Sequence, residues 1–494
     1  MSVSAPPRPA QAGGPNAGAA RGDVIVGDQP IRRPDTRSPR IMTRRAWWLV
    51  ALNFLIPGSA QSLTGSRRLG RVGLVATFLM WFGIAAGIVT AFLWPDVLTA
   101  LAANGAALLL LQLVLLAYAI LWVVLTIDTL RLVRFVKLLP LARPLVAVTA
   151  ILGLVVGAGG AAYAAQQFLA PAREFLASIF TNNAPPVPPS NGYYNILLLG
   201  ADSGLGRDSM RFDSISVVSV NAETGQTHIT GIPRDLANVP FSDGPMHDLY
   251  PNGLEGHQSN SCGWGPGINQ LMNAVEICRE DGGTGLYPDA AANSSTPAIE
   301  ATKSAAEGVL GIEIPYYVFV DMKGFADIVD ALGGVDITVT ERLPKGGGPR
   351  YPGESAEKWA IGWIEVGPQH MDGDTAQWYA RSRYTTSDWD RMRRQRELQQ
   401  AILAQANPAN VLSRFQAVAA AGEDLVQTDI PASLLPFLVD LAAKAKELPV
   451  QTLELTPEGA NIDTDHPTAE QFAYVRGLIQ QALYPPSPTP TPGS

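Results

Sequence analysis

Three apolar runs in the first third of the chain constrain its fold more than any other feature. They cover residues 72–93, 106–127 and 145–165, and none contains a charged side chain. About 20 consecutive apolar residues are what a helix needs to cross the hydrocarbon core of a bilayer. The runs therefore predict three spanning helices within a membrane region at residues 46–166. A shorter run at 46–58 is cut by Pro57 and Gly58, and we expect it to be interfacial or re-entrant.

Basic residues around these runs predict their orientation. Arginines precede the first run, and arginine and lysine lie between the second and third, whereas the loop at 94–104 has neither. The positive-inside rule therefore places the N-terminus in the cytoplasm and everything after the third run outside it. Residues 1–45 are rich in Pro, Ala, Gly and Arg without apolar periodicity. They are predicted to be a disordered, basic cytoplasmic tail.

The remainder predicts an α/β domain with a mixed central sheet and helices on both faces. After a linker at 167–192, the runs NILLLG, SISVVSV and HITGI have the length of strands. A strand, helix and strand at 316–340 predict a crossover unit, which implies a mixed or parallel sheet. The domain is expected at 193–405. A helix is predicted at 391–406. A helical extension at 406–484, with helices at 412–421, 432–448 and 469–483, and a disordered tail at 485–494 follow.

Composition excludes some classes of function. The net charge is −8, whereas a nucleic-acid binder needs a basic face. The two cysteines, Cys262 and Cys278, are too few for a zinc cluster. In an oxidising location they are expected to form a bridge, which for a loop of this size stabilises the fold by about 3 kcal/mol. Two unpaired thiols are the alternative.

Charged residues stand at the ends of the first three predicted strands. They are Asp202 after the first, Arg211 and Asp213 before the second, and Arg234 and Asp235 after the third. Carboxylates are hard ligands for a divalent cation, and guanidinium groups bind phosphoryl oxygens in a planar fork. The set predicts a site for a metal and a phosphate at one sheet edge. The alternative is loops that carry solvated salt bridges.

A second dense group of charges lies near the predicted helix at 391–406. It contains Arg381, Arg383, Asp388, Asp390, Arg391, Arg393, Arg394, Gln395 and Arg396. Arg381 and Arg383 straddle a helix end, where cations are favoured and a phosphate could be clamped. For Arg393, Arg394 and Arg396 we expect ordinary solvated pairs on a helix surface.

A series of sequence blocks resembles the extracytoplasmic domain of the LytR-CpsA-Psr family. In order they are ILLLGAD, RFDS, GIPRD, GINQ, GFADIVDALGGVDI, GPQHMDGDTAQWYARSR and SDWDRMRRQ, spread over residues 193–405. The resemblance implies a membrane-anchored phosphotransferase that attaches polyprenyl-pyrophosphate-linked glycopolymers to peptidoglycan. It also implies Mg²⁺ or Mn²⁺ as cofactor and membrane lipid as a partner, with no nucleic acid.

The resemblance assigns roles to ten residues. The metal would be held by Asp202 and Asp213, the pyrophosphate by Arg234, Arg381, Arg383, Arg391 and Gln395, and the catalytic group would be Arg211, Asp235 and Asp388. For Asp235 and Asp388 we favour orientation of an arginine over a role as base. Two departures matter, because Gly204 and Gly267 stand where many members have Arg and Lys.

The implied reaction is attack by a cell-wall hydroxyl on the glycan-bearing phosphorus, with polyprenyl phosphate leaving. This chemistry needs positioning and charge neutralisation more than a nucleophile on the protein. A polyprenyl-pyrophosphate hydrolase is the nearby alternative. Because glycine replaces two basic residues of the family, a non-catalytic lipid-binding or regulatory role is a further alternative. Binding to nucleic acid, suggested by the basic run at 391–396, would require strongly salt-sensitive association.

Overall fold

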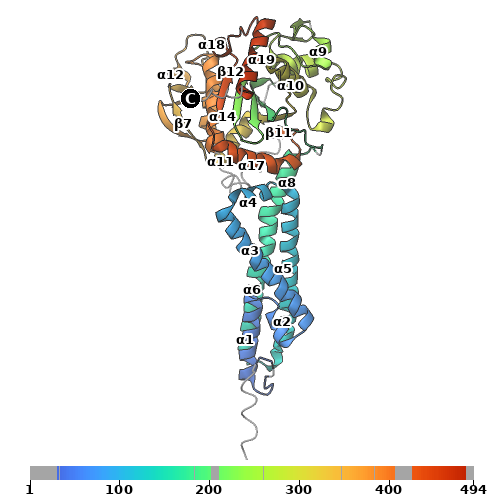
Figure 1. Cartoon of the computed structure of the whole chain (residues 1–494). Helices are drawn as coiled ribbons and strands as arrows, with labels where there is room; N and C mark the ends of the chain where they lie inside the picture. The colour runs from blue at the N-terminus through green and yellow to red at the C-terminus, as the bar shows by residue number, and fades with distance from the viewer. Residues whose placement is uncertain are drawn as a thin grey trace, which may run out of the picture. The chain divides into compact units, whose positions relative to one another are not determined.

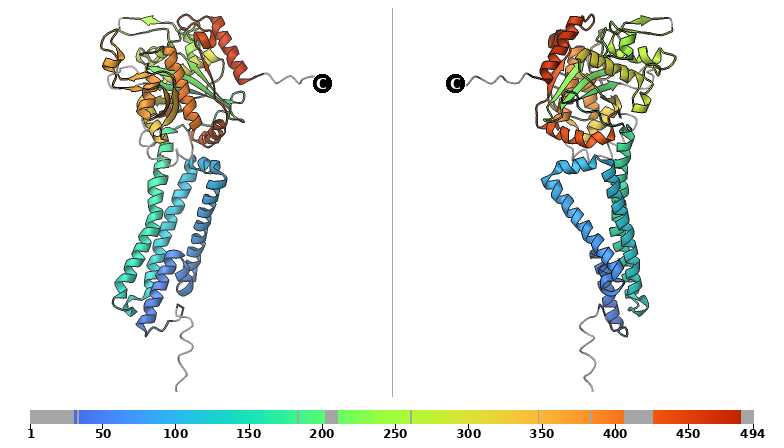
Figure 2. Two further views of the ribbon diagram at one scale, coloured as in Figure 1. Left: turned by 90° about the vertical axis from the view of Figure 1, so that its left-hand side faces the viewer. Right: turned by 45° about the vertical axis from the view of Figure 1, so that its right-hand side comes forward.

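The computed structural model describes residues 31–32, 34–182, 184–201, 211–259, 261–346, 348–382, 384–405 and 426–485. Figures 1 and 2 show its elements. They form two compact units, one made of Met1–Ala86 and Leu113–Ala165, the other of Gly87–Gln112 and Gln166–Ser494.

Within the described residues, three helices are long and apolar enough to cross a membrane. They run over Arg67–Leu93 (α3), Gly105–Val133 (α5) and Ala142–Glu174, the last beginning as α6 (Ala142–Leu154). Each contains one of the apolar runs singled out in the sequence. The orientation of these helices stays a prediction.

The short apolar run forms a helical hairpin in the first unit. Helix α1 (Pro39–Leu55) and helix α2 (Ser59–Thr64) are joined at Gly58, which has φ 96°. Asn53 Nδ2 donates to Thr126 Oγ1 over 2.9 Å, and Gln61 Nε2 donates to the Leu125 carbonyl over 2.7 Å. These bonds give the buried amide N–H groups of α1 and α2 acceptors on α5.

The tail predicted at 1–45 is too long, because α1 already begins at Pro39. Proline is favoured at the first position of a helix, where its missing N–H is not needed. Arg45 is buried rather than solvated and donates to the carbonyls of Ile31 and Leu132. Residues 1–30, and 486–494 of the predicted C-terminal tail, lie outside the described residues.

The second unit is built on a mixed six-stranded sheet within the described ranges, in the order β11-β6-β1-β2-β3-β12. The strands are β1 (Tyr193–Ala201), β2 (Phe212–Asn221), β3 (Thr227–Ile232), β6 (Tyr316–Asp321), β11 (Val426–Thr428) and β12 (Gln451–Glu454). Strand β1 is parallel to β6 and antiparallel to β2, and β3 is antiparallel to β2 and parallel to β12. The predicted mixed α/β sheet is confirmed.

Helices cover both faces of this sheet. Leu197 and Leu199 of β1 belong to a core cluster that includes α10 (Pro297–Leu310) and α19 (Ala469–Leu483). Tyr194, which has the opposite parity along the strand, packs in a cluster with Leu441 of α17 (Leu435–Lys446). Because successive side chains point to opposite faces, one short apolar strand supplies both cores.

The predicted crossover unit at 316–340 is wrong. Helix α11 (Met322–Leu332) does follow β6, but β7 (Val335–Val339) pairs with β10 (Gly367–Met371) in a separate two-stranded sheet. Both edges of β6 are already occupied, by β1 and by β11. The residues of β7 alternate between buried and exposed, which suits a sheet with one solvated face.

The C-terminal region at 406–484 is not a purely helical extension. It supplies β11 and β12, the two edge strands of the central sheet, besides α17 and α19. These strands have only three and four residues, which is too short for alternation to show. The helix predicted at 412–421 lies outside the described residues.

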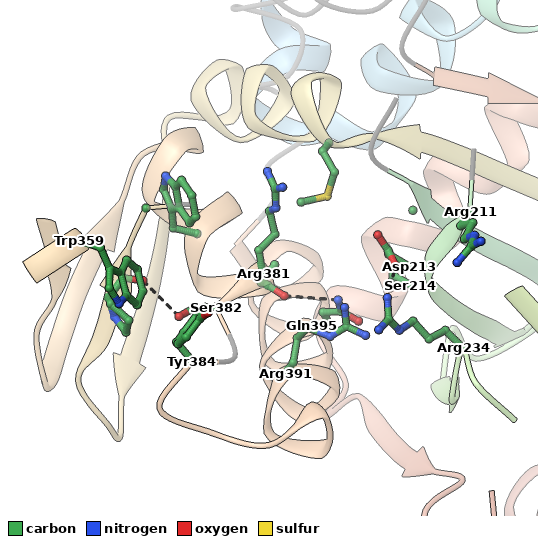
Figure 3. A pocket seen from close by; sticks show the side chains of 16 residues that line it. Arg211, Asp213, Ser214, Arg234, Trp359, Arg381, Ser382, Tyr384, Arg391 and Gln395 are labelled. Atoms are coloured by element: carbon green, nitrogen blue, oxygen red, sulfur yellow. Dashed lines mark hydrogen bonds and ion pairs between the residues drawn. The ribbon is translucent and has the colours of Figure 1, made fainter. Parts of the chain in front are cut away.

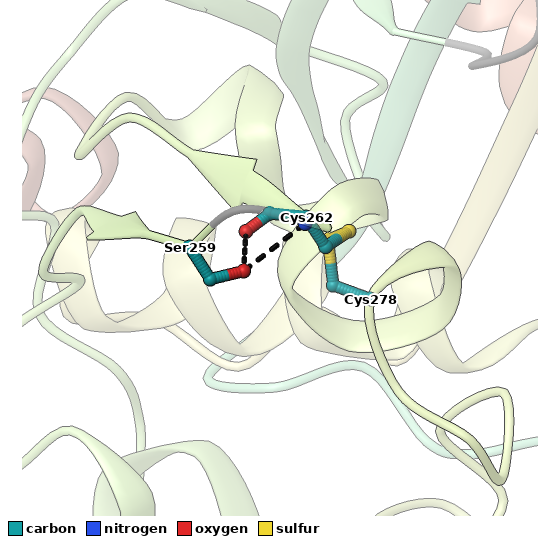
Figure 4. Close-up of a disulfide and its surroundings, with 3 residues drawn as sticks. All are labelled: Ser259, Cys262 and Cys278. Atoms are coloured by element: carbon teal, nitrogen blue, oxygen red, sulfur yellow. Dashed lines mark hydrogen bonds between the residues drawn. A yellow bond between two sulfur atoms is a disulfide. The ribbon is translucent and has the colours of Figure 1, made fainter.

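The predicted disulfide is confirmed between Cys262 and Cys278 (Figure 4). It ties the loop after β4 (His257–Gln258) to the end of the helical turn η5 (Asn273–Ile277). The Cys262 amide also donates to Ser259 Oγ over 3.0 Å.

A buried ion cluster holds the edge strand β11 to the rest of the unit. Lys303 Nζ lies 2.8 Å from both Asp429 Oδ2 and Glu300 Oε1. The Tyr317 amide donates to Asp429 Oδ1, and Asn182 Nδ2 donates to the Asp429 carbonyl, each over 2.7 Å. Burial lowers the pKa of Lys303, but the charges of Asp429 and Glu300 outweigh that effect and hold the pKa above its usual range.

We expect the substitution Lys303→Met to lower the midpoint of thermal unfolding of the full-length protein by about 5–10 °C, because it leaves Asp429 buried without its cation. Scanning calorimetry in detergent measures this. Lys444→Met is the matched control, since Lys444 and its partner Asp440 are each 46% exposed. It should shift the midpoint by no more than about 2 °C. Equal shifts for the two variants would contradict a stabilising role for the cluster.

Candidate functional site

The strand directions gather several chain segments at one edge of the central sheet. Strands β1, β3 and β6 run the same way and end at this edge, where β2 begins. In the register, Ala201 at the end of β1 pairs with Phe212 on one side and Asp321 on the other. The carboxyl ends of parallel strands are where sheets of this class bind ligands.

A β-bulge aims Asp213 into this edge. Gly200 pairs with Ser214 and Ala201 pairs with Phe212, so Asp213 is an extra residue on β2. Such bulges redirect a side chain next to functional sites. Phe212 packs into the core with its ring centroid 6.1 Å from that of Phe319, whereas Asp213 and Ser214 both line a cavity.

The cavity has a volume of about 550 Å³ and collects residues from distant segments (Figure 3). Six residues predicted from the sequence line it: Arg211, Asp213, Arg234, Arg381, Arg391 and Gln395. They come from β2 and the residue just before it, from the segment after β3, from α13 (Gly373–Arg381) and from α14 (Asp388–Gln405). The predicted convergence of the two charge groups is therefore present in the structure. Asp202 and Arg383 lie outside the described residues.

Two further predicted residues, Asp235 and Asp388, contact arginines of the cavity. Asp235 Oδ2 lies 3.3 Å from Arg234 Nε, and its Oδ1 accepts a 2.8 Å bond from Asn269 Nδ2. Asp388 Oδ2 lies 3.2 Å from Arg391 Nη2. These contacts match the orienting role favoured from the sequence. Asn269 was not singled out as a site residue, although it belongs to the GINQ block.

Positive charge dominates the described lining. Arg234 Nη1 lies 2.5 Å from Asp213 Oδ1. Burial alone would lower the pKa of Arg234, but the carboxylates of Asp235, Asp213 and Asp388 raise it above the usual value. Arg211, Arg381 and Arg391 line the same space. A cavity of this kind favours an anion with several oxygens, because planar guanidinium forks bind phosphoryl groups in two-point contacts.

Arg394 is a positioning residue, and the expectation that it is solvated is wrong. Its side chain is 2% exposed. Nε donates to the Tyr379 carbonyl over 3.0 Å, Nη2 donates to the Ser382 carbonyl, and Nη1 lies 3.2 Å from Glu341 Oε1. These bonds satisfy carbonyls that the end of α13 leaves open. They hold the segment that carries Arg381 against α14.

Arg396 is also buried, whereas Arg393 remains exposed as expected. Arg396 Nε lies 3.2 Å from Glu454 Oε1 of β12, and its side chain is 3% exposed. A Cβ at Gly231, which pairs with Glu454, would fall 2.1 Å from the Glu454 carboxylate. The glycine in β3 therefore makes room for this pair. Arg393 is 53% exposed, so the expectation of solvation holds for it alone among the three.

The described lining fits a divalent cation only in part. Within the described ranges, no group of three or more His, Cys, Asp or Glu side chains is placed to hold a metal ion. Mg²⁺, however, is commonly held by one or two carboxylates together with substrate phosphates and water. Asp213 supplies such a carboxylate in the cavity, so the donor set is compatible with that kind of site.

The other part of the cavity is aromatic, and the sequence did not identify it. Its lining includes Met322, Pro344, Trp359, Trp378 and Tyr384. The guanidinium carbon of Arg381 lies 5.6 Å from the centroid of the Trp378 ring, at the border between the two parts. The cavity therefore combines a cationic part with an aromatic part.

Comparison with known proteins identifies a family match. The model of the LytR_cpsA_psr family matches residues 172–254 and 291–475, more than half of the chain. The match continues past residue 405, the predicted end of the domain, and includes both edge strands.

Similar proteins come from bacteria. Biofilm regulatory protein A of Streptococcus mutans is 26% identical over 278 residues, which cover 55% of this chain and 58% of that protein. A polyisoprenyl-teichoic acid–peptidoglycan teichoic acid transferase, TagU of Bacillus cereus, is 26% identical over 238 residues, which cover 48% of this chain and 60% of that protein. The matched part thus spans about 60% of these relatives. The crystal structure of TagV from B. subtilis has 20% identity and a TM-score of 0.39, covering 59% of this chain and 97% of that one.

We expect Arg394→Lys to weaken binding of inorganic pyrophosphate by about tenfold, because lysine keeps the charge but cannot donate a fork to two carbonyls. Isothermal titration calorimetry on the full-length protein measures the dissociation constant. The neighbouring change Arg393→Lys should leave it within about twofold. If the two variants bound pyrophosphate equally well, Arg394 would not position the cavity.

Proposed function

Because this chain belongs to the LytR_cpsA_psr family, we propose that it transfers a glycopolymer phosphate from a polyprenyl-pyrophosphate carrier to a hydroxyl of peptidoglycan, releasing polyprenyl phosphate. The observation that carries the proposal is the cavity at the sheet edge, which is lined by arginines from the residue just before β2, from the segment after β3, from α13 and from α14. The name of the relative TagU, a teichoic acid transferase, supports the same class of reaction.

The residues of the cavity suit the pyrophosphate of such a carrier. Arg234, Arg381 and Arg391 would bind its oxygens, with Arg211 close by and Gln395 as a neutral donor. The acceptor hydroxyl attacks the phosphorus that bears the glycan. The bond from that phosphorus to the bridging oxygen breaks, and the carrier leaves as its monophosphate. Charge that develops on the phosphoryl oxygens is met by guanidinium groups already in place.

Carboxylates that contact these arginines serve to orient them. Asp235 and Asp388 each contact an arginine of the cavity, and Asn269 in turn donates to Asp235. A guanidinium held by a carboxylate and supported by further hydrogen bonds loses little freedom when a phosphate arrives. The proton of the attacking hydroxyl can pass to a phosphoryl oxygen or to water, so the reaction does not require a base among these two residues.

Mg²⁺, or Mn²⁺, is the cofactor that we propose for the site. Asp213, at the bulge in β2, would hold it together with phosphate oxygens, and Asp202 would be the second carboxylate. When bound, the ion neutralises charge on the pyrophosphate. The 2.5 Å pair between Asp213 and Arg234 fixes the carboxylate at the cavity wall.

The membrane region supports the proposal that the substrate is linked to a lipid. We propose that the three apolar helices span the cell membrane with the N-terminus in the cytoplasm, which places the second unit's catalytic domain outside. A carrier lipid would then be available in the same bilayer as the protein. Peptidoglycan, the proposed acceptor, lies on that side of the membrane.

We expect Arg381→Ala and Asp213→Asn each to lower the rate of glycan transfer by about 10²-fold or more, because each removes a charge that faces the reacting phosphate. The assay uses the full-length protein in nanodiscs, a polyprenyl-pyrophosphate-linked oligosaccharide and purified peptidoglycan. Arg342→Ala is the matched control, since Arg342 stacks on Trp363 and does not line the cavity. Release of free oligosaccharide phosphate without transfer to peptidoglycan would instead identify a hydrolase. Full activity in both site variants would refute the proposed site.

Removing divalent metal should abolish transfer, and Mg²⁺ or Mn²⁺ should restore it. For Asp213→Asn we expect the metal concentration that gives half-maximal activity to rise by about tenfold, because one carboxylate ligand is lost. Titration of metal into chelator-treated protein measures this. Unchanged activity in the chelator would show that the arginines alone neutralise the phosphate.

A further inference from the structure

The aromatic part of the cavity contains a ring pair that does not belong to a core. Trp359 ends the short helix α12 (Ala356–Trp359), and Tyr384 follows α13. Their ring centroids lie 4.6 Å apart with the ring planes tilted by 58°. Tyr384 is 51% exposed, whereas Tyr379, five residues earlier, is 1% exposed and packed in a core cluster. The pair is therefore a surface of the cavity and not part of its support.

A small hairpin holds Trp359 in place. Strands β8 (Leu343–Lys345) and β9 (Gly362–Ile364) pair with one another, and Leu343 and Ile364 are buried in the second core cluster. The Ile361 amide donates to the Lys345 carbonyl over 2.9 Å and closes the segment that carries α12. The buried base of the hairpin therefore places the half-buried indole ring of Trp359 on a rigid support.

Glycine and serine position Tyr384. Gly348 has φ 101°, and a Cβ there would fall 2.6 Å from Cε2 of the Tyr384 ring. The glycine therefore lets the loop pass directly against the ring. Ser382, which is buried, donates from Oγ to the Pro344 carbonyl over 3.2 Å and ties the start of the segment to the hairpin. Tyr384 and Trp359 are thus held by the same structure.

In Figure 3, Arg381 lies between two pairs of residues. Trp359 and Tyr384 are on one side of it, whereas Asp213 and Arg234 are on the other. A ligand that occupies both parts must join a phosphate to a group that suits aromatic rings at a solvent-exposed site. A pyranose ring has this property, because it presents C–H groups on its face and hydroxyls at its edge, and aromatic side chains offer the matching apolar face with a polar rim. An isoprenoid chain stacked on Tyr384 would stay partly in water, which is unfavourable for a purely apolar group.

We infer that Trp359 and Tyr384 form a subsite for the sugar ring joined to the reacting phosphate. This inference rests on the proposed transfer reaction and names a substrate contact for it. The ring has two sources of the same chemistry, namely the first sugar of the carried glycan or the acceptor sugar of peptidoglycan. During transfer, either sugar is linked to the phosphorus through one oxygen atom and would therefore lie next to Arg381.

The test compares Trp359→Ala and Tyr384→Ala with Trp363→Ala in the full-length protein in nanodiscs. Trp363 belongs to the same hairpin but stacks on Arg342, with 3.8 Å from the guanidinium carbon to the ring centroid, and does not line the cavity. Binding is measured for polyprenyl pyrophosphate and for the same lipid carrying one N-acetylhexosamine. Transfer kinetics are measured with a soluble peptidoglycan oligosaccharide as the varied substrate.

If the subsite holds the donor sugar, both site variants lose about tenfold in affinity for the sugar-bearing lipid and keep their affinity for polyprenyl pyrophosphate. If it holds the acceptor, both affinities stay unchanged, and the KM for the oligosaccharide rises about tenfold while kcat changes little. In either case Trp363→Ala behaves as the unchanged protein, and Trp359→Phe, which keeps a ring, restores most of the loss.

Two results would overturn the inference and leave the proposed function in place. In one, the site variants match the control in every measurement. In the other, they lose affinity equally for the lipid with and without sugar, which would assign the ring pair to the carrier. Failure of the unchanged protein to bind either lipid would instead refute the proposed function, and the subsite with it.

Discussion

Mutual repulsion between guanidinium groups is the constraint on which the cavity depends. Arginines brought together from several elements would move apart or remain in solvent unless negative charge lay close to them. Asp213 and Asp235 supply that charge to Arg234, and Asp388 supplies it to Arg391, so these two arginines keep their positions without a ligand. Because Asp235 and Asp388 do not line the cavity, the space itself stays electropositive. The result is a site organised for a polyanion before one arrives.

The polar side chains of helix α14 have different roles on different sides of the helix. Arg391 and Gln395 are four residues apart, which places them on one side of the helix, and both line the cavity. Arg394 and Arg396 point elsewhere and are buried, where they hold the end of α13 and the edge strand β12. The same guanidinium chemistry thus lines the cavity on one side of the helix and supports the scaffold on the others. The rigidity of the site therefore depends on residues that do not touch it.

Prediction of the fold was reliable where a pattern is local and long. The apolar runs, the first three strands and helices α11 and α19 follow from length and periodicity alone. Prediction was unreliable where the pairing between strands determines which sheet a segment joins. Nothing in the segment 335–339 indicates that it leaves the central sheet, and nothing in the short segments at 426–428 and 451–454 indicates that they complete it. Edge strands of three or four residues are too short to show a periodic sequence pattern. They are stabilised by pairing with neighbouring strands.

By itself the sequence determined the kinds of chemistry that the chain contains: membrane-length apolar runs, carboxylates and arginines at strand ends, and an order of blocks that marks the family. The tertiary structure alone decided which of these residues meet. The bulge that turns Asp213 toward the cavity, the burial of Arg394 and the pairing of Trp359 with Tyr384 depend on contacts between segments far apart in the chain. Local patterns report a residue's immediate neighbours, whereas burial and charge pairing are set by packing across the whole unit.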